Sequence, residues 1–166
     1  MKGAMESKSK ALLTKEFQDV LKIVAERMTT HKVEWALIGS TNCALQGMKV
    51  SPKDLDVVVK LEDLRRMSEV FDGYAVSPVE ELTAMGLSNE PAWEVRVGIG
   101  GAPVQILGEK NIGEYVSKLI AKRIIEIKDE ESAILCLTLD AEADAYTETN
   151  RPQKAERIME FLQTRK

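Results

Sequence analysis

Several residue types are scarce in this sequence, and each scarcity excludes a class of protein. The 166 residues include one histidine, His31, and no apolar run near the roughly 18–20 residues that a membrane-spanning helix requires. A hydrolase with a Ser-His-Asp or Cys-His centre would depend on His31, which stands among polar residues where a helix is predicted to end. The polar, lysine-rich start has no signal-peptide core. We therefore expect a cytoplasmic protein that is not a histidine-dependent hydrolase and has no membrane partner.

Cysteine and net positive charge are also scarce. The two cysteines, Cys43 and Cys136, lie in apolar surroundings and lack the spacing of metal ligands, which predicts buried free thiols in a reducing compartment. The formal net charge is −4, so the molecule as a whole does not attract nucleic acid electrostatically. Any binding of nucleic acid would have to depend on a local basic patch.

What the chain does contain is typical of one globular domain. It is 44% hydrophobic and 30% charged, and 166 residues suffice to bury a sizeable core. The polar residues 1–10 are predicted to form a disordered lead-in, and residues 11–166 a single domain. No internal repeat, low-complexity tract or linker divides this domain.

The spacing of apolar residues predicts the order of helices and strands. The predicted helices span 11–31, 40–47, 61–74 and, in the tail, 139–166, where Pro152 starts the last helix. The predicted strands span 33–39 and 55–60, and a hairpin spans 92–108. Residues 74–91 are predicted to form a loop or a short helical turn, and 111–137 a helix with one or two short strands. This order predicts an α/β (α+β) fold with a small mixed β-sheet, flanking helices and a helical C-terminal tail.

A small-residue turn, Gly39-Ser40, follows directly on the first predicted strand. A strand that ends in this way before a helix brings backbone N–H groups and the positive end of the helix to one place, which favours a phosphate. Gly39 lets the backbone approach a ligand, and the Ser40 hydroxyl can add a hydrogen bond. The alternative is a tight turn in which Ser40 or Thr41 only caps the helix.

Two carboxylates, Asp54 and Asp56, flank a single leucine where the next strand begins. Residues two apart on a strand point to the same face, so these side chains are expected to lie side by side. Two unpaired carboxylates at that separation repel each other, and Mg²⁺, which prefers oxygen ligands, would relieve the repulsion. The alternative is an exposed start of the strand, where water and Lys53 screen the charges.

The two features together suggest one chemistry. Asp54 stands fifteen positions after Gly39, so the turn and the carboxylate pair meet if their strands are neighbours in the sheet. A phosphate site beside a metal site suits phosphoryl or nucleotidyl transfer, in which positioning and charge neutralisation provide most of the catalysis.

The stretches "ALIGSTNCALQG" and "KDLDVVV" resemble the signature of the nucleotidyltransferase superfamily, which has the polymerase β-like fold. More narrowly, the chain is similar to small, single-domain members that are common in archaea, whose helical tail the stretch "LDAEADAYTETNRPQKAERI" also resembles. The resemblance covers most of residues 33–162, and the Gly-Ser and Asp-x-Asp motifs are its most specific parts.

The resemblance implies roles for particular residues. Gly39 and Ser40 would hold the β- and γ-phosphates of a nucleoside triphosphate, and Asp54 and Asp56 would ligate Mg²⁺ as catalytic residues. Further nucleotide contacts would come from Asn42 and Lys154.

The third catalytic position departs from the family pattern. Relatives have Val-Asp-Ile or Val-Glu-Ile on the returning strand of the hairpin, where this chain has Gln105. An amide cannot act as a base near neutral pH and is a weaker metal ligand than a carboxylate. Glu94, on the outgoing strand, is a candidate to replace the missing carboxylate.

Three functions remain open at the level of sequence. The first is a Mg²⁺-dependent transfer of a nucleoside monophosphate from a nucleoside triphosphate to a hydroxyl acceptor, with release of pyrophosphate. The second is a catalytically inactive module that binds a nucleotide or a protein partner, which Gln105 would explain. The third is a domain whose Asp pair is merely solvated. On the last helix, Arg151, Lys154 and Arg157 share a face that could meet a triphosphate, meet an acidic partner or remain solvated.

Overall fold

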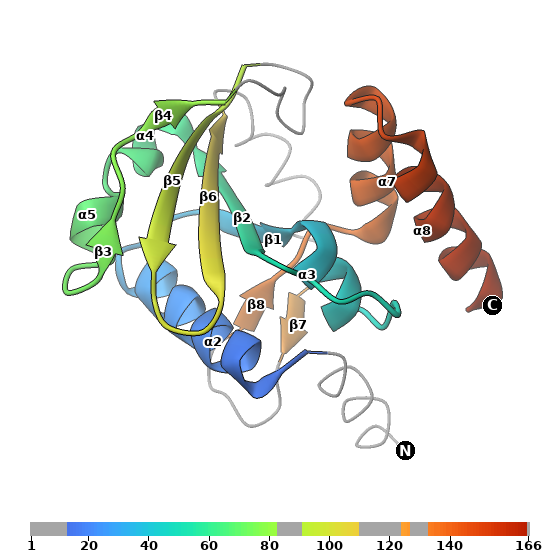
Figure 1. The fold of residues 1–166 in the computed structure, drawn as a ribbon, viewed down its shortest axis with the longest axis horizontal. Helices are drawn as coiled ribbons and strands as arrows, with labels where there is room; N and C mark the ends of the chain where they lie inside the picture. Colours follow the sequence, from blue (N-terminus) through green and yellow to red (C-terminus); the bar gives the residue numbers. More distant parts are fainter. Residues whose placement is uncertain (1–12, 83–90, 110–123, 127–132, 166) are drawn as a thin grey trace.

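A mixed β-sheet forms the centre of the computed structural model, which describes residues 13–82, 91–109, 124–126 and 133–165 (Figure 1). The strand order is β1-β2-β6-β5-β3, and β4 also pairs with β5. Strands β2 and β6 are parallel, whereas the other neighbours in this sheet are antiparallel. The bounds are β1 Trp35–Ile38, β2 Leu55–Lys60, β3 Ala75–Val76, β4 Glu80–Glu81, β5 Trp93–Gly98 and β6 Pro103–Glu109.

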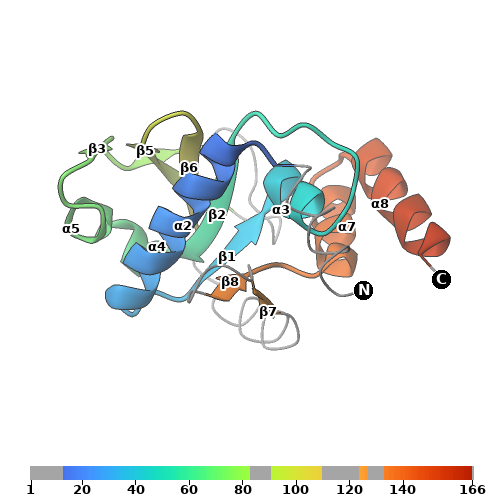
Figure 2. The ribbon, with the colours of Figure 1, turned by 90° about the horizontal axis from the view of Figure 1, so that it is seen from below.

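Helix α2, Lys15–Thr30, covers one face of this sheet (Figure 2). It begins where the Thr14 hydroxyl accepts a hydrogen bond of 3.2 Å from the backbone N–H of Phe17, and it ends at His31. Its apolar residues recur every three or four positions, which confirms the predicted amphipathic helix. They pack on alternate residues of the strands, among them Val57, Val95 and Ile106.

The opposite face of the sheet carries the polar residues of the same strands. The helices α7, Leu139–Glu148, and α8, Pro152–Thr164, form a pair beside β1 and β2, away from α5 and β3 (Figures 1 and 2). Ala141 and Ala145 of α7 belong to one apolar cluster with Ala36 of β1 and Val58 of β2, and Leu107 of β6 packs against this cluster. Helix α7 therefore packs on this face of the sheet through β1, β2 and β6.

The helix predicted over 61–74 is interrupted. It forms two single turns, α4 Leu61–Leu64 and α5 Met67–Val70, separated by Arg65 and Arg66. At the break, the Arg66 guanidinium donates hydrogen bonds of 3.0 Å to the carbonyl oxygen of His31 and to Asp63. The contact with His31 joins residues 35 positions apart in the sequence, and the spacing of apolar residues does not encode it.

The prediction of a loop or helical turn over 74–91 is wrong for two short segments. Residues 75–76 and 80–81 are the strands β3 and β4, which pair with β5. Two-residue strands are too short to show an alternating pattern, so pairing with an existing edge determines them. Residues 83–90 lie outside the described part of the chain.

The chain after β6 is described in pieces. Strand β7, Ile124–Glu126, pairs antiparallel with β8, Ala133–Leu135, within the region predicted to hold one or two short strands. The tail is helical as predicted, with Pro152 in the first turn of α8, and Asn150 between the two helices has a positive φ of 61°. The predicted lead-in, 1–10, lies outside the described residues. Where the chain is described, no helix has both the length and the apolar character to span a membrane.

Candidate active site

Gly39 brings the first turn against the carboxylate pair. It begins the short helix α3, Gly39–Leu45, directly after β1, and Ile38 pairs in register with Asp56 on β2. The φ of Gly39 is +74°, and a Cβ atom at this position would lie 3.0 Å from Oδ2 of Asp56. Strands β1 and β2 are therefore neighbours, and only a residue without a side chain allows this approach.

A second contact fixes the segment before β2. The Thr41 side chain on α3 is fully buried, and its hydroxyl donates a 2.7 Å hydrogen bond to the backbone carbonyl of Asp54. The loop that carries Asp54 is thereby held by the same helix that begins at Gly39. Both predicted metal ligands are thus attached to the turn, through Thr41 in one case and through packing on Gly39 in the other.

The carboxylate of Asp56 has an unsatisfied oxygen. Its Oδ1 is buried and has no hydrogen-bond partner among the described residues. Burial and, after it, the charge of Asp54 raise the pKa of Asp56 to about 6, while Arg96, Lys154 and Arg151 oppose this rise. A buried oxygen without a partner is costly, and a cation held between the two carboxylates would satisfy it.

The donor set fits Mg²⁺ when a phosphate is also present. Within the described ranges, no group of three or more His, Cys, Asp or Glu side chains is placed to hold a metal ion. Mg²⁺ commonly takes one or two carboxylates and completes its shell with water and substrate phosphates. Asp54 and Asp56 match this kind of site.

A carboxylate that the sequence analysis missed lies behind the turn. Glu142 on α7 is 1% exposed, and its Oε1 accepts a 2.6 Å hydrogen bond from the backbone N–H of Gly39. This N–H was predicted to face a phosphate, but it points to Glu142. The helical pattern of the tail could have revealed Glu142, because it lies three residues after Leu139 and four before Tyr146, on the buried side of α7.

Asn42, predicted to bind the nucleotide, is part of the same buried network. Its side chain has no exposed surface, and its amide group donates to Oε1 of Glu142 at 3.0 Å and to the carbonyl of Leu137 at 2.9 Å. Its own side-chain oxygen accepts a 2.7 Å hydrogen bond from Gln46. The structure therefore places Asn42 beneath the turn as a support, with no surface directed at a ligand.

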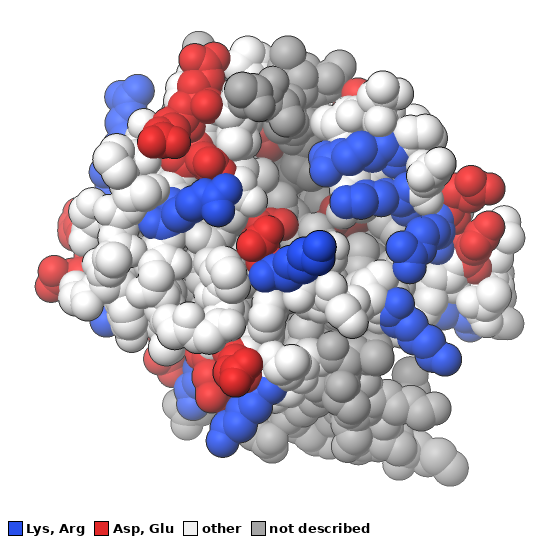
Figure 3. Space-filling model, viewed as in Figure 1, with Lys and Arg blue, Asp and Glu red and all other residues white. Residues whose placement is uncertain are grey.

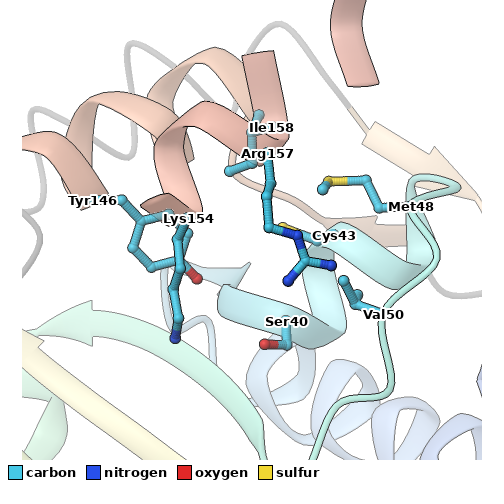
Figure 4. Close-up of a pocket in the computed structure, with 8 residues that line it drawn as sticks. All are labelled: Ser40, Cys43, Met48, Val50, Tyr146, Lys154, Arg157 and Ile158. Carbon is cyan, nitrogen blue, oxygen red and sulfur yellow. The ribbon is translucent and has the colours of Figure 1, made fainter. Parts of the chain in front are cut away.

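Ser40 lies in a small pocket beside two cations. Lys154 and Arg157 of α8 extend toward Ser40, over a floor that includes Cys43 and Tyr146 (Figure 4). The Tyr146 ring supports two cations, Lys154, whose Nζ lies 5.5 Å from the ring centroid, and Arg151, whose guanidinium lies 4.9 Å from it. Figure 3 shows lysine and arginine side chains gathered on the α7–α8 side of this face.

The structure thus brings two of the four predicted nucleotide contacts into one pocket. Ser40 and Lys154 share one pocket, and Arg157, for which a solvated position remained open, lines it too. Cys43, at the floor of this pocket, is a buried free thiol as predicted, and so is Cys136.

Gln105 occupies the predicted third position, next to Asp56. The two residues pair in register across β6 and β2, and Gln105 also pairs with Arg96 on β5. The Gln105 amide donates a hydrogen bond to the Glu94 carboxylate, which also forms a 3.6 Å ion pair with Arg96. The Glu94 side chain is only 13% exposed, so a carboxylate does stand beside the amide that replaces the expected acid.

The fold is a mixed α/β architecture with a small sheet and a helical C-terminal segment, and a solved structure shares it. The crystal structure of a putative nucleotidyltransferase from Thermotoga maritima is similar, with a TM-score of 0.64 and 23% sequence identity. The match covers 92% of this chain and 96% of that one. No family model matches this chain, and a search of curated proteins found no match. At 23% sequence identity, this similarity shows that the two proteins share a fold.

Proposed function

We propose that this protein is a Mg²⁺-dependent nucleotidyltransferase of the small, single-domain archaeal type. It binds a nucleoside triphosphate between β2, α3 and α8, transfers the nucleoside monophosphate to a hydroxyl acceptor and releases pyrophosphate. The observation that carries the proposal is the buried, unpartnered Oδ1 of Asp56, next to Asp54 and against the Gly39 turn. The fold shared with the Thermotoga maritima protein supports it.

Each residue of the site has a role in this proposal. Asp54 and Asp56 hold Mg²⁺, which neutralises phosphate charge in the transition state when it is bound. The Ser40 hydroxyl donates to a phosphate oxygen, and Lys154 and Arg157 balance the negative charge of the triphosphate. Gly39 contributes the space beside Asp56, because its N–H is already bonded to Glu142.

The charges around the site fit a triphosphate better than a long nucleic acid. Arg151, Lys154 and Arg157 lie within two turns of α8 and its cap, whereas the whole chain carries a net charge of −4. Three cations in one place match the charge of one triphosphate, and Figure 3 shows basic side chains gathered on the α7–α8 side of this face. A cytoplasmic location, where nucleoside triphosphates are abundant, belongs to the same proposal.

Calorimetric titration tests the binding step. Mg²⁺ with a non-hydrolysable nucleoside triphosphate analogue is titrated into the wild type, Asp56→Asn and, as a matched control, Asp19→Asn on the exposed side of α2. We expect binding to the wild type and to Asp19→Asn, and at least about a tenfold loss in Asp56→Asn. Binding that is equal in all three proteins, or absent from the wild type, contradicts the proposal.

A second candidate function is a nucleotide-binding or protein-interaction module without turnover. The observation in its favour is Gln105, which places an amide where relatives carry an acid. The hydrogen bond from Gln105 to Glu94 favours the enzyme instead, because it holds a carboxylate beside the same position.

Pyrophosphate release separates the two functions. The wild type, Glu94→Gln, Gln105→Glu and the exchange variant Glu94→Gln/Gln105→Glu are assayed with each nucleoside triphosphate. For an enzyme that uses Glu94, we expect release by the wild type, a loss of about 100-fold or more in Glu94→Gln, and partial recovery in the exchange variant. Nucleotide binding without release by the wild type, together with release by Gln105→Glu, would instead support the inactive module.

A further inference from the structure

Glu142 is an unusual residue for the buried side of α7. The helix has three other acidic residues, Asp140, Asp144 and Glu148, and all three are exposed, whereas Glu142 is 1% exposed. Burial of a carboxylate is unfavourable unless hydrogen bonds compensate, and an apolar residue often stabilises such a position at least as well. Packing of α7 alone therefore does not account for an acid at position 142.

The contacts of Glu142 all lead to the turn between β1 and α3. Its Oε1 accepts from the backbone N–H of Gly39 at 2.6 Å and from the Asn42 amide at 3.0 Å. Gln46 donates to the Asn42 oxygen at 2.7 Å and to the carbonyl of Leu137 at 2.9 Å. The network joins the start of α3 to the segment that leads into α7.

From Gly39 the contact continues to Asp56. The Gly39 Cα lies so close to this carboxylate that an added Cβ would stand 3.0 Å from its Oδ2. A displacement of the Gly39 peptide by a few tenths of an ångström therefore changes the position available to Asp56. The hydrogen bond from the Gly39 N–H to Glu142 holds this peptide in place.

We propose that Glu142 is a positioning residue of the candidate active site, which holds the Gly39 peptide in place through its hydrogen bonds and thereby sets Asp56 for cation binding. The inference rests on the proposed function, because only there are Asp54 and Asp56 metal ligands that a residue of the tail could support. Residues of this kind, which touch no metal but orient its ligands, commonly change metal affinity by 10–100-fold when they are removed.

The test uses three variants of the full-length chain. Glu142→Ala removes the acceptor, Glu142→Gln keeps an acceptor oxygen without the charge, and Asp144→Asn changes an exposed acid on the same helix. The first measurement is made without metal, from the ¹⁵N–¹H spectrum and the hydrogen exchange of the Gly39 and Asp56 amides. The second is the affinity for Mn²⁺, used as a paramagnetic probe, and the third is the melting temperature.

We expect both amides to shift and the Gly39 amide to lose protection in Glu142→Ala, with at least a tenfold weaker affinity for Mn²⁺. Glu142→Gln should restore both properties to within about threefold of the wild type, and Asp144→Asn should leave them unchanged. A role in stability alone would lower the melting temperature without changing the Mn²⁺ affinity of the folded protein.

Three results overturn the inference. They are an unchanged Gly39 amide in Glu142→Ala, an unchanged Mn²⁺ affinity in this variant, and an equal loss of Mn²⁺ affinity in Glu142→Ala and Glu142→Gln. Failure of the proposed function looks different, because the wild type itself then binds no Mn²⁺; in that case the role toward the cation fails with it, even if the Gly39 amide responds to the substitution.

Discussion

At the scale of single residues, the absence of a side chain at position 39 matters as much as any functional group in the site. Gly39 has a positive φ of +74° and lies against Asp56. Gly73 has a similar positive φ of +93°, but a Cβ there would meet nothing within 4 Å. An alanine would therefore be strained at either position, but its methyl group would contact Asp56 only at position 39.

Gly39→Ala and Gly73→Ala separate these two effects. Each substitution should lower the free energy of unfolding by about 1–2 kcal/mol, because an L-residue is strained at positive φ. Only Gly39→Ala should also weaken Mn²⁺ binding, since its methyl group displaces the Asp56 carboxylate. Urea unfolding and Mn²⁺ titration of both variants provide the measurement, and equal Mn²⁺ affinities would contradict the assigned role of Gly39.

Glu142 also predicts a dependence of stability on pH. Burial raises its pKa from 4.5 to about 7, although the hydrogen bonds from Asn42 and Gly39 oppose the rise. Between these pH values the folded protein binds a proton that the unfolded chain has released, so the free energy of unfolding decreases as the pH rises through this window.

Glu142→Gln removes this titration. Relative to Glu142→Gln, the wild type should lose up to roughly 3 kcal/mol of unfolding free energy between about pH 4.5 and pH 7, with a constant difference outside this window. Urea unfolding at intervals of half a pH unit, without metal, measures the difference. Parallel curves for the two proteins would show that Glu142 does not titrate in this range.

Candidate residues with reactive or charged side chains could be proposed from the sequence, whereas contacts made only in the folded interior could not. Asp54, Asp56, Ser40 and Lys154 were proposed from the motifs in which they stand. The helical spacing of the tail places Glu142 on the buried side of α7, but it does not show the contact with Gly39, which lies 103 positions earlier in the sequence. Asn42 was predicted to bind the nucleotide, but the sequence could not show that its side chain is buried in the interior.

At the scale of elements, α8 supplies the cations of the site. Lys154 and Arg157 line the pocket of Ser40, and Lys154 also lowers the pKa of Asp56. Arg165 caps the other end of the same helix, where its guanidinium stacks on Phe161 at 5.3 Å from the ring centroid. The helix thus contains the two cations assigned to the nucleotide and also Arg165, which contacts Phe161 and can serve as a control.

Lys154→Ala and Arg157→Ala should each weaken the binding of the Mg²⁺–nucleotide complex about tenfold, or about 1.4 kcal/mol. Each should also reduce the dependence of this affinity on salt concentration, because one fewer cation faces the phosphates. Arg165→Ala should change neither quantity. Calorimetric titration at two salt concentrations measures both, and a similar loss in Arg165→Ala would show a general effect of charge.

Helices and strands were predictable where they are long enough to show the periodic spacing of apolar residues. Helix α2, strand β2 and the hairpin of β5 and β6 show the three-to-four-residue or two-residue spacing of apolar positions and were predicted. The two-residue strands β3 and β4 have no such spacing. The break between α4 and α5 depends on the contact of Arg66 with His31, which lies 35 residues earlier in the chain.

At the scale of the whole molecule, the mixed sheet converts separate motifs into one site. The parallel pairing of β2 with β6 and the antiparallel pairing of β2 with β1 put Asp56 between Ile38 and Gln105. The sequence predicted a mixed sheet but not which strands are neighbours, because strand order depends on long connections that carry no local signal. The sequence could therefore predict only that the turn and the carboxylates meet if their strands are neighbours in the sheet.

Ligand binding should stabilise the whole fold in a way that depends on pH. Asp56, with its pKa raised to about 6, is largely protonated at pH 5 and ionised at pH 7.5, so cations compete with a proton at the lower pH. Mg²⁺ with the nucleotide analogue at 100 times its dissociation constant should add about 2.7 kcal/mol at pH 7.5 and clearly less at pH 5.

Thermal unfolding with and without the ligands at both pH values measures this effect. Asp56→Asn, which has no carboxyl group to titrate, should show little stabilisation at either pH. Stabilisation of the wild type that is the same at pH 5 and pH 7.5 would show that Asp56 does not receive the cation.

The attachment of the tail to the Gly39 turn has a consequence for protein engineering. The pair α7–α8 supplies both the acid that supports this turn and the basic side chains that face it. A designer who transplants the glycine-serine loop and the Asp-x-Asp strand into another scaffold would move the ligands but leave their support behind. The smallest portable version of this centre therefore includes the two terminal helices, although they are the segments furthest from it in the sequence.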